Sequence, residues 1–178
     1  NARWDLIDLL RMTRALRPAG IHWPVNEDGK PSFRLEALTA ANNIPHEGAH
    51  DAMVDVYATI AMARLVKTAQ PRLYDFYWGL RSKHTVLGLL DLAAHTSVVH
   101  VSGMFPAEQG CLGVVMPLLK HPHNNNGIIV LNLLQDPAHW LELSADQIRD
   151  RLYARSEDLP EGEPRIALKT LHLNRAPA

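Results

Sequence analysis

The spacing of apolar residues changes along this chain, and this change limits the possible folds more than any other feature. Between Asp51 and Ala69 apolar residues recur every three or four positions until Pro71, so the spacing predicts a long helix. Beyond about residue 95 the apolar residues come in short blocks bounded by Gly, Pro or Asn, which is typical of strands. We therefore expect a mixed α/β chain with a helical first part and a mainly β second part.

Further helices are predicted on both sides of this long one. Residues 4–16 have helical spacing, and Ser32 is a plausible N-cap for a second helix. A short helical piece is expected at residues 73–80. Ser144 and Gln147 have the spacing of a capping box, which predicts a late helix that begins after Ser144.

The strands are expected at residues 98–101, 114–119, 128–134 and 166–173. In the last of these Ile166 and Leu168 share one face while Leu171 and Leu173 share the other, which predicts a bulge. We place the boundary between the two parts near residues 70–95. The first predicted domain covers residues 1–70 and the second covers residues 71–178.

The composition excludes several classes of protein. A chain of 178 residues with 47% hydrophobic residues can build a core for one domain or two small ones. It has no run of about eighteen apolar residues and no basic start followed by an apolar core, so we expect neither a membrane span nor a secretory leader. A single cysteine, Cys111, excludes an internal disulfide and agrees with a cytoplasmic location. Because the net charge is -1, a polyanion must be bound by a local patch.

The stretch PHEGAHDAMVD at residues 45–55 permits two interpretations. His46 and His50 are the histidines of H-E-x-x-H, a motif in which two histidines one helical turn apart hold zinc. That motif needs a continuous helix, yet Pro45 precedes it and Gly48 interrupts it. No other histidine lies at a spacing that nominates a third zinc ligand. A zinc protease is therefore the weaker alternative.

The second interpretation rests on His50 and Asp55. If the helix begins at Asp51, His50 lies in the loop at its start and Asp55 projects one turn inside, so both can point into one cleft. A carboxylate that holds Mg²⁺ beside a histidine that takes a proton from water suits phosphodiester hydrolysis. The spacing alone leaves open a packing role for His50 and a solvated Asp55, since such pairs are common.

Several longer segments support the second interpretation. The stretch SFRLEALTAANNIPHEGAHDAMVDVYATIAMARLV resembles the third motif of the DEDDh 3′–5′ exonuclease family, in which a helix leads through a loop to H-x-A-x-x-D, here His50 to Asp55. The segments RWDLIDLLR, ALRPAGIHWP, AHDAMVDVYATIAMARLVKTAQPRL and HVSGMF resemble more specifically its bacterial exonuclease I members. By this resemblance His50 is the general base and Asp55 holds metal in a site with two Mg²⁺ ions. The resemblance implies a cytoplasmic monomer that degrades single-stranded DNA to 5′-mononucleotides in DNA repair and recombination. It also implies the C-terminal part of an RNase H-like domain, followed by an incomplete SH3-like antiparallel β domain.

The same resemblance shows which metal ligands are missing. The family supplies further carboxylates from an Asp-x-Glu on an early strand and an aspartate on a later helix, both before the H-x-A-x-x-D motif. Asp5 and Asp8 lie on a predicted helix and lack that spacing. One carboxylate cannot hold two metal ions, because each hard cation needs several oxygen ligands. Since the chain also begins at Asn1 and not at methionine, we expect a fragment that is inactive by itself.

Cationic and aromatic side chains are candidate contacts for single-stranded DNA. Arg11, Arg14 and Arg17 recur every three residues and form a stripe on the first helix, although such runs are often solvated surface and aromatic residues are often core. By resemblance Arg11 and Arg34 contact the strand, and Arg17 contacts the acidic tail of a single-stranded DNA-binding protein. Further candidate DNA contacts are Phe76, Lys83, Asn126 and Tyr153. A non-catalytic module that binds single-stranded DNA or an acidic tail is the alternative function.

Overall fold

The structure, a computed structural model, describes residues 3–46, 52–154, 158–159 and 166–176. The chain divides into two compact units. The first unit comprises residues 1–88, 100–112 and 173–178, and the second comprises residues 89–99 and 113–172. In the described part of the chain, no helix is both long and apolar enough to cross a membrane.

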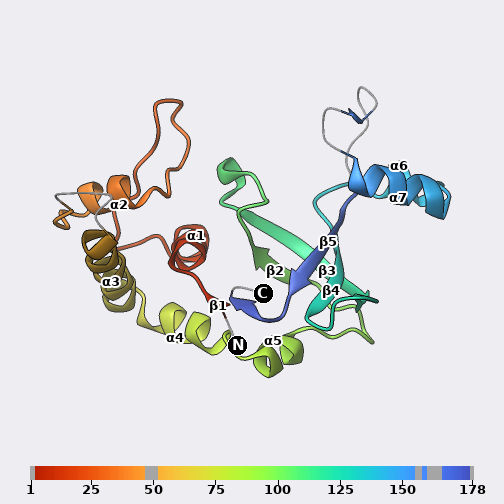
Figure 1. Cartoon of the computed structure of the whole chain (residues 1–178), viewed down its shortest axis with the longest axis horizontal. Helices are drawn as coiled ribbons and strands as arrows, with labels where there is room; N and C mark the ends of the chain where they lie inside the picture. Colours follow the sequence, from red (N-terminus) through yellow and green to blue (C-terminus); the bar gives the residue numbers. More distant parts are fainter. Residues whose placement is uncertain (1–2, 47–51, 155–157, 160–165, 177–178) are drawn as a thin grey trace. The chain divides into compact units, whose positions relative to one another are not determined.

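The first unit is mainly helical (Figure 1). Its helices are α1 (Leu6–Leu16), α2 (Leu35–Ala41), α3 (Ala52–Ala69), α4 (Pro71–Gly79) and α5 (Lys83–Leu89), and a 3-10 turn, η1, spans Ala107–Gln109. Two short strands, β1 (Arg3–Trp4) and β6 (Arg175–Ala176), pair in parallel. The first and last parts of the described chain therefore belong to the same unit.

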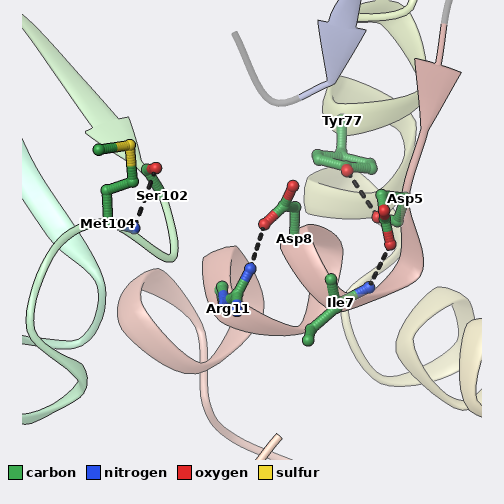
Figure 2. A network of polar contacts seen from close by, with 7 residues as sticks. All are labelled: Asp5, Ile7, Asp8, Arg11, Tyr77, Ser102 and Met104. Atoms are coloured by element: carbon green, nitrogen blue, oxygen red, sulfur yellow. Dashed lines mark hydrogen bonds and ion pairs between the residues drawn. The ribbon is translucent and has the colours of Figure 1, made fainter. Parts of the chain in front are cut away.

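The core of this unit lies between α1, α3 and α4. The Asp5 carboxylate caps α1 by accepting a hydrogen bond from the Ile7 N–H at 3.2 Å. The Tyr77 hydroxyl, on α4, donates to the backbone oxygen of Asp5 at 2.7 Å, so α4 is fixed to the start of α1 (Figure 2). Apolar side chains from the three helices fill the space between them: Leu9, Leu10, Met12, Ala58, Met62, Val66 and Tyr77 are all buried.

The second unit contains most of a four-stranded sheet with strand order β2-β3-β4-β5, in which the β3–β4 and β4–β5 pairs are antiparallel. These strands are β2 (Val98–Val101), β3 (Leu112–Lys120), β4 (Gly127–Asn132) and β5 (Leu168–His172). Burial alternates along most of β3, as expected for a strand with one face on a core. Two helices, α6 (Ala138–Leu141) and α7 (Ala145–Tyr153), lie in sequence between β4 and β5.

The predicted mixed class of the fold is confirmed, and so are most of its elements. The long helix, the helix after Pro71 and the four main strands lie where the spacing placed them. Ser144 accepts a hydrogen bond from the Gln147 N–H while the Gln147 side chain accepts one from the Ser144 N–H, which confirms the capping box. The split into domains 1–70 and 71–178 stays a prediction, and α4 and α5 belong to the first compact unit.

Three local predictions were wrong, and one helix was missed. The first helix begins at Leu6 because Trp4 belongs to strand β1, and Arg34, not Ser32, occupies the N-cap position of α2. Helix α5 was not predicted. The β4–β5 register is regular over Leu168–His172, so no bulge occurs there. The irregularity lies instead in β3 between Pro117 and Leu119, where proline cannot donate a ladder hydrogen bond.

Candidate functional site

Asp55 lies in the first turn of α3, and 40% of its side chain is exposed. The N-terminal turn of a helix carries unpaired N–H groups and the positive end of the helix dipole, so it favours a carboxylate. The predicted placement of Asp55 at the start of the long helix is therefore confirmed. Asp55 is therefore partly exposed at a position that favours an ionised carboxylate.

His46 contacts Asp55 directly. The chain reverses after α2 through Asn43, whose φ is 53°, and the Ile44 N–H donates to the Thr39 backbone oxygen at 2.9 Å. This reversal places the His46 ring so that its Nε2 lies 2.9 Å from Asp55 Oδ1. Its Nδ1 lies 3.1 Å from Thr39 Oγ1, and the ring is almost fully buried. His46 therefore connects the last turn of α2 to the first turn of α3.

These contacts disfavour the zinc-protease interpretation of H-E-x-x-H. Both ring nitrogens of His46 already have hydrogen-bonding partners, and His46 lies in a loop and not on a helix. Among the described residues, no group of three or more His, Cys, Asp or Glu side chains could hold a metal ion. His50 lies outside the described residues, so its role as general base stays a prediction.

The sequence alone did not identify the contact between His46 and Asp55. H-E-x-x-H suggested zinc for His46, whereas its actual partners are fixed by the left-handed turn at Asn43. Asparagine is one of the few non-glycine residues that adopts this conformation readily, so the pair Asn42-Asn43 after α2 was the available signal for a reversal.

Arg11, a predicted DNA contact, is held within the first unit. Its guanidinium donates to Asp8 Oδ1 at 2.7 Å (Figure 2). The guanidinium lies 5.8 Å from the centre of the Phe33 ring. It also lies against Gly103, where an added Cβ would come within 2.7 Å of the guanidinium carbon. With 22% of its side chain exposed, Arg11 has a structural role whatever else it binds.

The other predicted DNA contacts differ in exposure and belong to different units. Arg34 and Lys83 are exposed at the starts of α2 and α5 in the first unit. Asn126 is half-buried in the β3–β4 turn of the second unit, where its N–H donates to Asn124 Oδ1 at 3.0 Å. Tyr153 ends α7 in the same unit, and its side chain lies outside the described part. Their roles in DNA binding stay predictions.

Arg17 and Phe76 line one pocket of about 520 Å³ in the first unit. The pocket is formed by Leu16, Arg17, Gln70, Pro71, Arg72, Leu73 and Phe76, from the end of α1 and the start of α4. Its lining is mainly apolar, and it includes two arginines. The Gln70 side-chain amide donates to the Ala19 backbone oxygen at 2.8 Å and joins the two segments. From the sequence, Arg17 is expected to contact the acidic tail and Phe76 to contact DNA. Their shared pocket was not predicted, because the two residues lie far apart in the chain.

Comparison with known proteins extends over nearly the whole chain. Residues 81–178 match the family described as the Exonuclease I SH3-like domain, which confirms the SH3-like prediction. The exodeoxyribonuclease I of Escherichia coli strain K12 is 51% identical over 177 residues, which cover 99% of this chain and 37% of that protein.

Solved structures agree with this match. The crystal structure of E. coli exonuclease I in complex with a dA16 oligonucleotide has a TM-score of 0.94 and 52% identity, over 98% of this chain and 37% of that one. A structure described as an ExoI/SSB-Ct complex has a TM-score of 0.90 and 50% identity, over 98% of this chain and 37% of that one. The chain therefore spans less than half the length of the relatives it matches. By the identity along its length and by its SH3-like domain, this chain belongs to the exonuclease I family.

Proposed function

We propose that this chain is part of a Mg²⁺-dependent 3′–5′ exonuclease that degrades single-stranded DNA to 5′-mononucleotides. The observation that carries the proposal is the partly exposed Asp55 carboxylate at the start of α3. This carboxylate lies in a chain that is about half identical to exodeoxyribonuclease I along nearly its whole length. In the parent protein helices α1, α2 and α3 would belong to an RNase H-like nuclease domain.

The ligand chemistry of Asp55 fits a magnesium ion, but only as one part of a site. Mg²⁺ prefers carboxylate and water oxygens, and Asp55 offers a carboxylate that His46 already orients. Two hard cations need several such ligands, and the described residues provide no cluster of three. Other regions of the longer protein would have to complete the site, so we propose that the chain alone is inactive.

Asp55 and His50 would have different roles in phosphodiester hydrolysis. Bound metal would supply Lewis-acid activation of water and stabilisation of phosphate charge. Asp55 would hold and place one ion. His50, which precedes Asp55 by five positions, would take a proton from the attacking water, as the H-x-A-x-x-D motif implies.

Activity assays of the longer protein test this proposal. Release of 5′-mononucleotides from single-stranded DNA should need Mg²⁺, and Asp55→Asn should lower kcat by about 10³-fold, because a lost ligand removes several kcal/mol of charge stabilisation. The 178-residue chain alone should show no activity above its metal-free control. Full activity of the Asp55→Asn enzyme, or Mg²⁺-dependent activity of the isolated chain, would contradict the proposal.

The pocket that contains Arg17 favours a second binding function. We propose that it takes the acidic C-terminal tail of a single-stranded DNA-binding protein. The apolar lining suits an apolar terminal side chain, while Arg17 and Arg72 suit the carboxylates of the tail. On this proposal Phe76, which is 50% exposed and lines the same pocket, contacts the tail and not DNA.

A further inference from the structure

We infer that His46 is a positioning residue for the metal-binding carboxylate of Asp55, and that Thr39 in turn fixes His46. The inference rests on the proposed role of Asp55 and goes beyond it, because it assigns a function to the first histidine of the H-E-x-x-H stretch. Three side chains from α2, the following loop and α3 form a continuous hydrogen-bonded chain.

The direction of the hydrogen bond to Asp55 follows from chemistry. An ionised carboxylate only accepts hydrogen bonds, so His46 Nε2 must carry the hydrogen that it shares with Asp55 Oδ1 over 2.9 Å. Such a donor fixes the orientation of a metal-binding carboxylate, because the hydrogen bond limits rotation of the carboxylate about its Cβ–Cγ bond. His46 thereby selects one orientation of the Asp55 oxygens.

The other ring nitrogen is fixed to a rigid part of α2. Thr39 is fully buried, and its Oγ1 lies 3.1 Å from His46 Nδ1. The same Oγ1 lies 2.9 Å from the Leu35 backbone oxygen and 3.0 Å from that of Glu36, so it stays against the helix. Because both ring nitrogens are held, the imidazole cannot rotate without losing a hydrogen bond in a nearly dry site.

A purely structural role would also explain a buried histidine between two helices. The two roles differ in what they predict for metal affinity. If His46 only joins α2 to α3, its loss lowers the unfolding temperature and leaves the metal affinity of the folded protein unchanged. If it orients Asp55, its loss weakens metal binding even under conditions where the protein remains folded. Partners of ligating side chains typically contribute about 10–100-fold in affinity.

The test uses Mn²⁺ as the probe, with its affinity for the longer protein measured by electron paramagnetic resonance and the fold checked by circular dichroism. His46→Phe keeps a ring but no nitrogen, and should weaken Mn²⁺ binding by about 10–100-fold. His46→Gln places an amide N–H near the position of Nε2 and should restore most of the affinity, whereas the shorter His46→Asn should not. Thr39→Val should give a smaller loss. His84→Phe, an exposed histidine on α5, is the matched control and should have no effect.

Two results would overturn the inference. One is Mn²⁺ affinity of folded His46→Phe within twofold of the unchanged protein. The other is equal affinity of His46→Gln and His46→Asn, a comparison that stays decisive if the phenylalanine variant does not fold. Asp55→Asn separates this inference from the proposed function. If Asp55→Asn retains full Mn²⁺ affinity, the proposed metal-binding role of Asp55 is contradicted. If Asp55→Asn loses Mn²⁺ affinity while His46→Phe does not, only the positioning role of His46 is contradicted.

Discussion

His46 Nε2 lies 2.9 Å from Asp55 Oδ1, and only 6% of the His46 side chain is exposed. This contact disfavours the zinc interpretation of the PHEGAHDAMVD stretch, whereas the roles of His50 and Asp55 in its second half stay predictions. The histidine that resembles a zinc ligand instead holds the carboxylate that the exonuclease motif assigns to metal binding. His46 lies in the loop that follows α2, and Asp55 lies nine positions later in the first turn of α3.

Arg34 should contribute to DNA binding through charge, because it is exposed at the start of α2. Arg34→Ala in the longer protein should lower the slope of log K against log salt concentration by about 0.7, the value for one phosphate contact on a single strand. Fluorescence anisotropy of a labelled oligonucleotide at several salt concentrations measures this slope. An unchanged slope would exclude Arg34 as a phosphate contact. Arg64→Ala, at an exposed position on α3, serves as the charge control.

Gly103 should be required for the position of Arg11, because an added Cβ would meet the guanidinium at 2.7 Å. Gly103→Ala should reduce the free energy of unfolding by at most about 1 kcal/mol, because the guanidinium is the movable end of a long side chain and can shift at the cost of its partly exposed ion pair with Asp8. The cost should fall toward zero in an Arg11→Ala background, and a double-mutant cycle by urea unfolding measures this coupling.

Gly88→Ala is the control for this cycle. Gly88 lies on α5 with no atom within 4 Å of an added Cβ, so the substitution should be neutral or slightly stabilising. Equal costs of Gly103→Ala with and without Arg11 would show that the guanidinium is not the group displaced.

The pocket at the start of α4 should bind an acidic peptide that ends in an apolar residue with a free carboxylate. Arg17→Ala should weaken this binding by about 10-fold or more, since a charge-assisted hydrogen bond typically contributes 1.5–3 kcal/mol. Phe76→Ala should also weaken it, but with less dependence on salt, because its contact is apolar. Titration calorimetry with the peptide at two salt concentrations measures both effects. Equal affinities of the Arg17→Ala and Arg64→Ala variants would contradict the assignment.

The free energy of unfolding should decrease at high pH because of the buried Tyr77 phenol. Burial, with the nearby negative charge of Asp8, raises the pKa of the Tyr77 phenol well above its ordinary value of 10.0. Above pH 10 the unfolded chain loses this proton while the folded chain keeps it, so rising pH favours unfolding. The stability advantage over Tyr77→Phe should be about 1 kcal/mol below pH 10, from the hydrogen bond to the Asp5 carbonyl.

This advantage should shrink by up to about 1.4 kcal/mol per pH unit above 10. Urea unfolding of both proteins across this pH range measures it, and the comparison cancels the titration of groups that the two proteins share. A difference that does not change with pH would show that the phenol ionises equally well in the folded chain.

Local patterns predicted much of the fold because they depend on neighbours in sequence. The capping box of Ser144 and Gln147, the stop at Pro71 and the alternation in β3 are all properties of short segments. The features that were missed depend on distant partners. Trp4 was predicted to be helical, but it lies in β1 and pairs with Ala176. The residues next to Trp4 could not predict this parallel pairing, because its partner lies more than 170 positions away in the sequence.

The candidate site, like the fold, was predicted only where it depends on neighbours in sequence. The H-x-A-x-x-D motif placed Asp55 correctly at the start of α3, since the motif and the helix start share one short segment. It could not show that His46 holds this carboxylate, because the contact depends on a left-handed turn and on Thr39 in the previous helix. Nor could spacing show that Arg11 is held by Asp8, Phe33 and Gly103, since only the folded unit brings Gly103 near.

The role of Asp55 is tested most directly by an anomalous difference map from crystals of the longer protein soaked in Mn²⁺. We expect an ion at about 2.0–2.2 Å from a carboxylate oxygen of Asp55, the distance expected for a small divalent cation, while His46 Nε2 keeps its hydrogen bond to Oδ1. An ion bound to the His46 ring, or ions that do not contact Asp55, would contradict it.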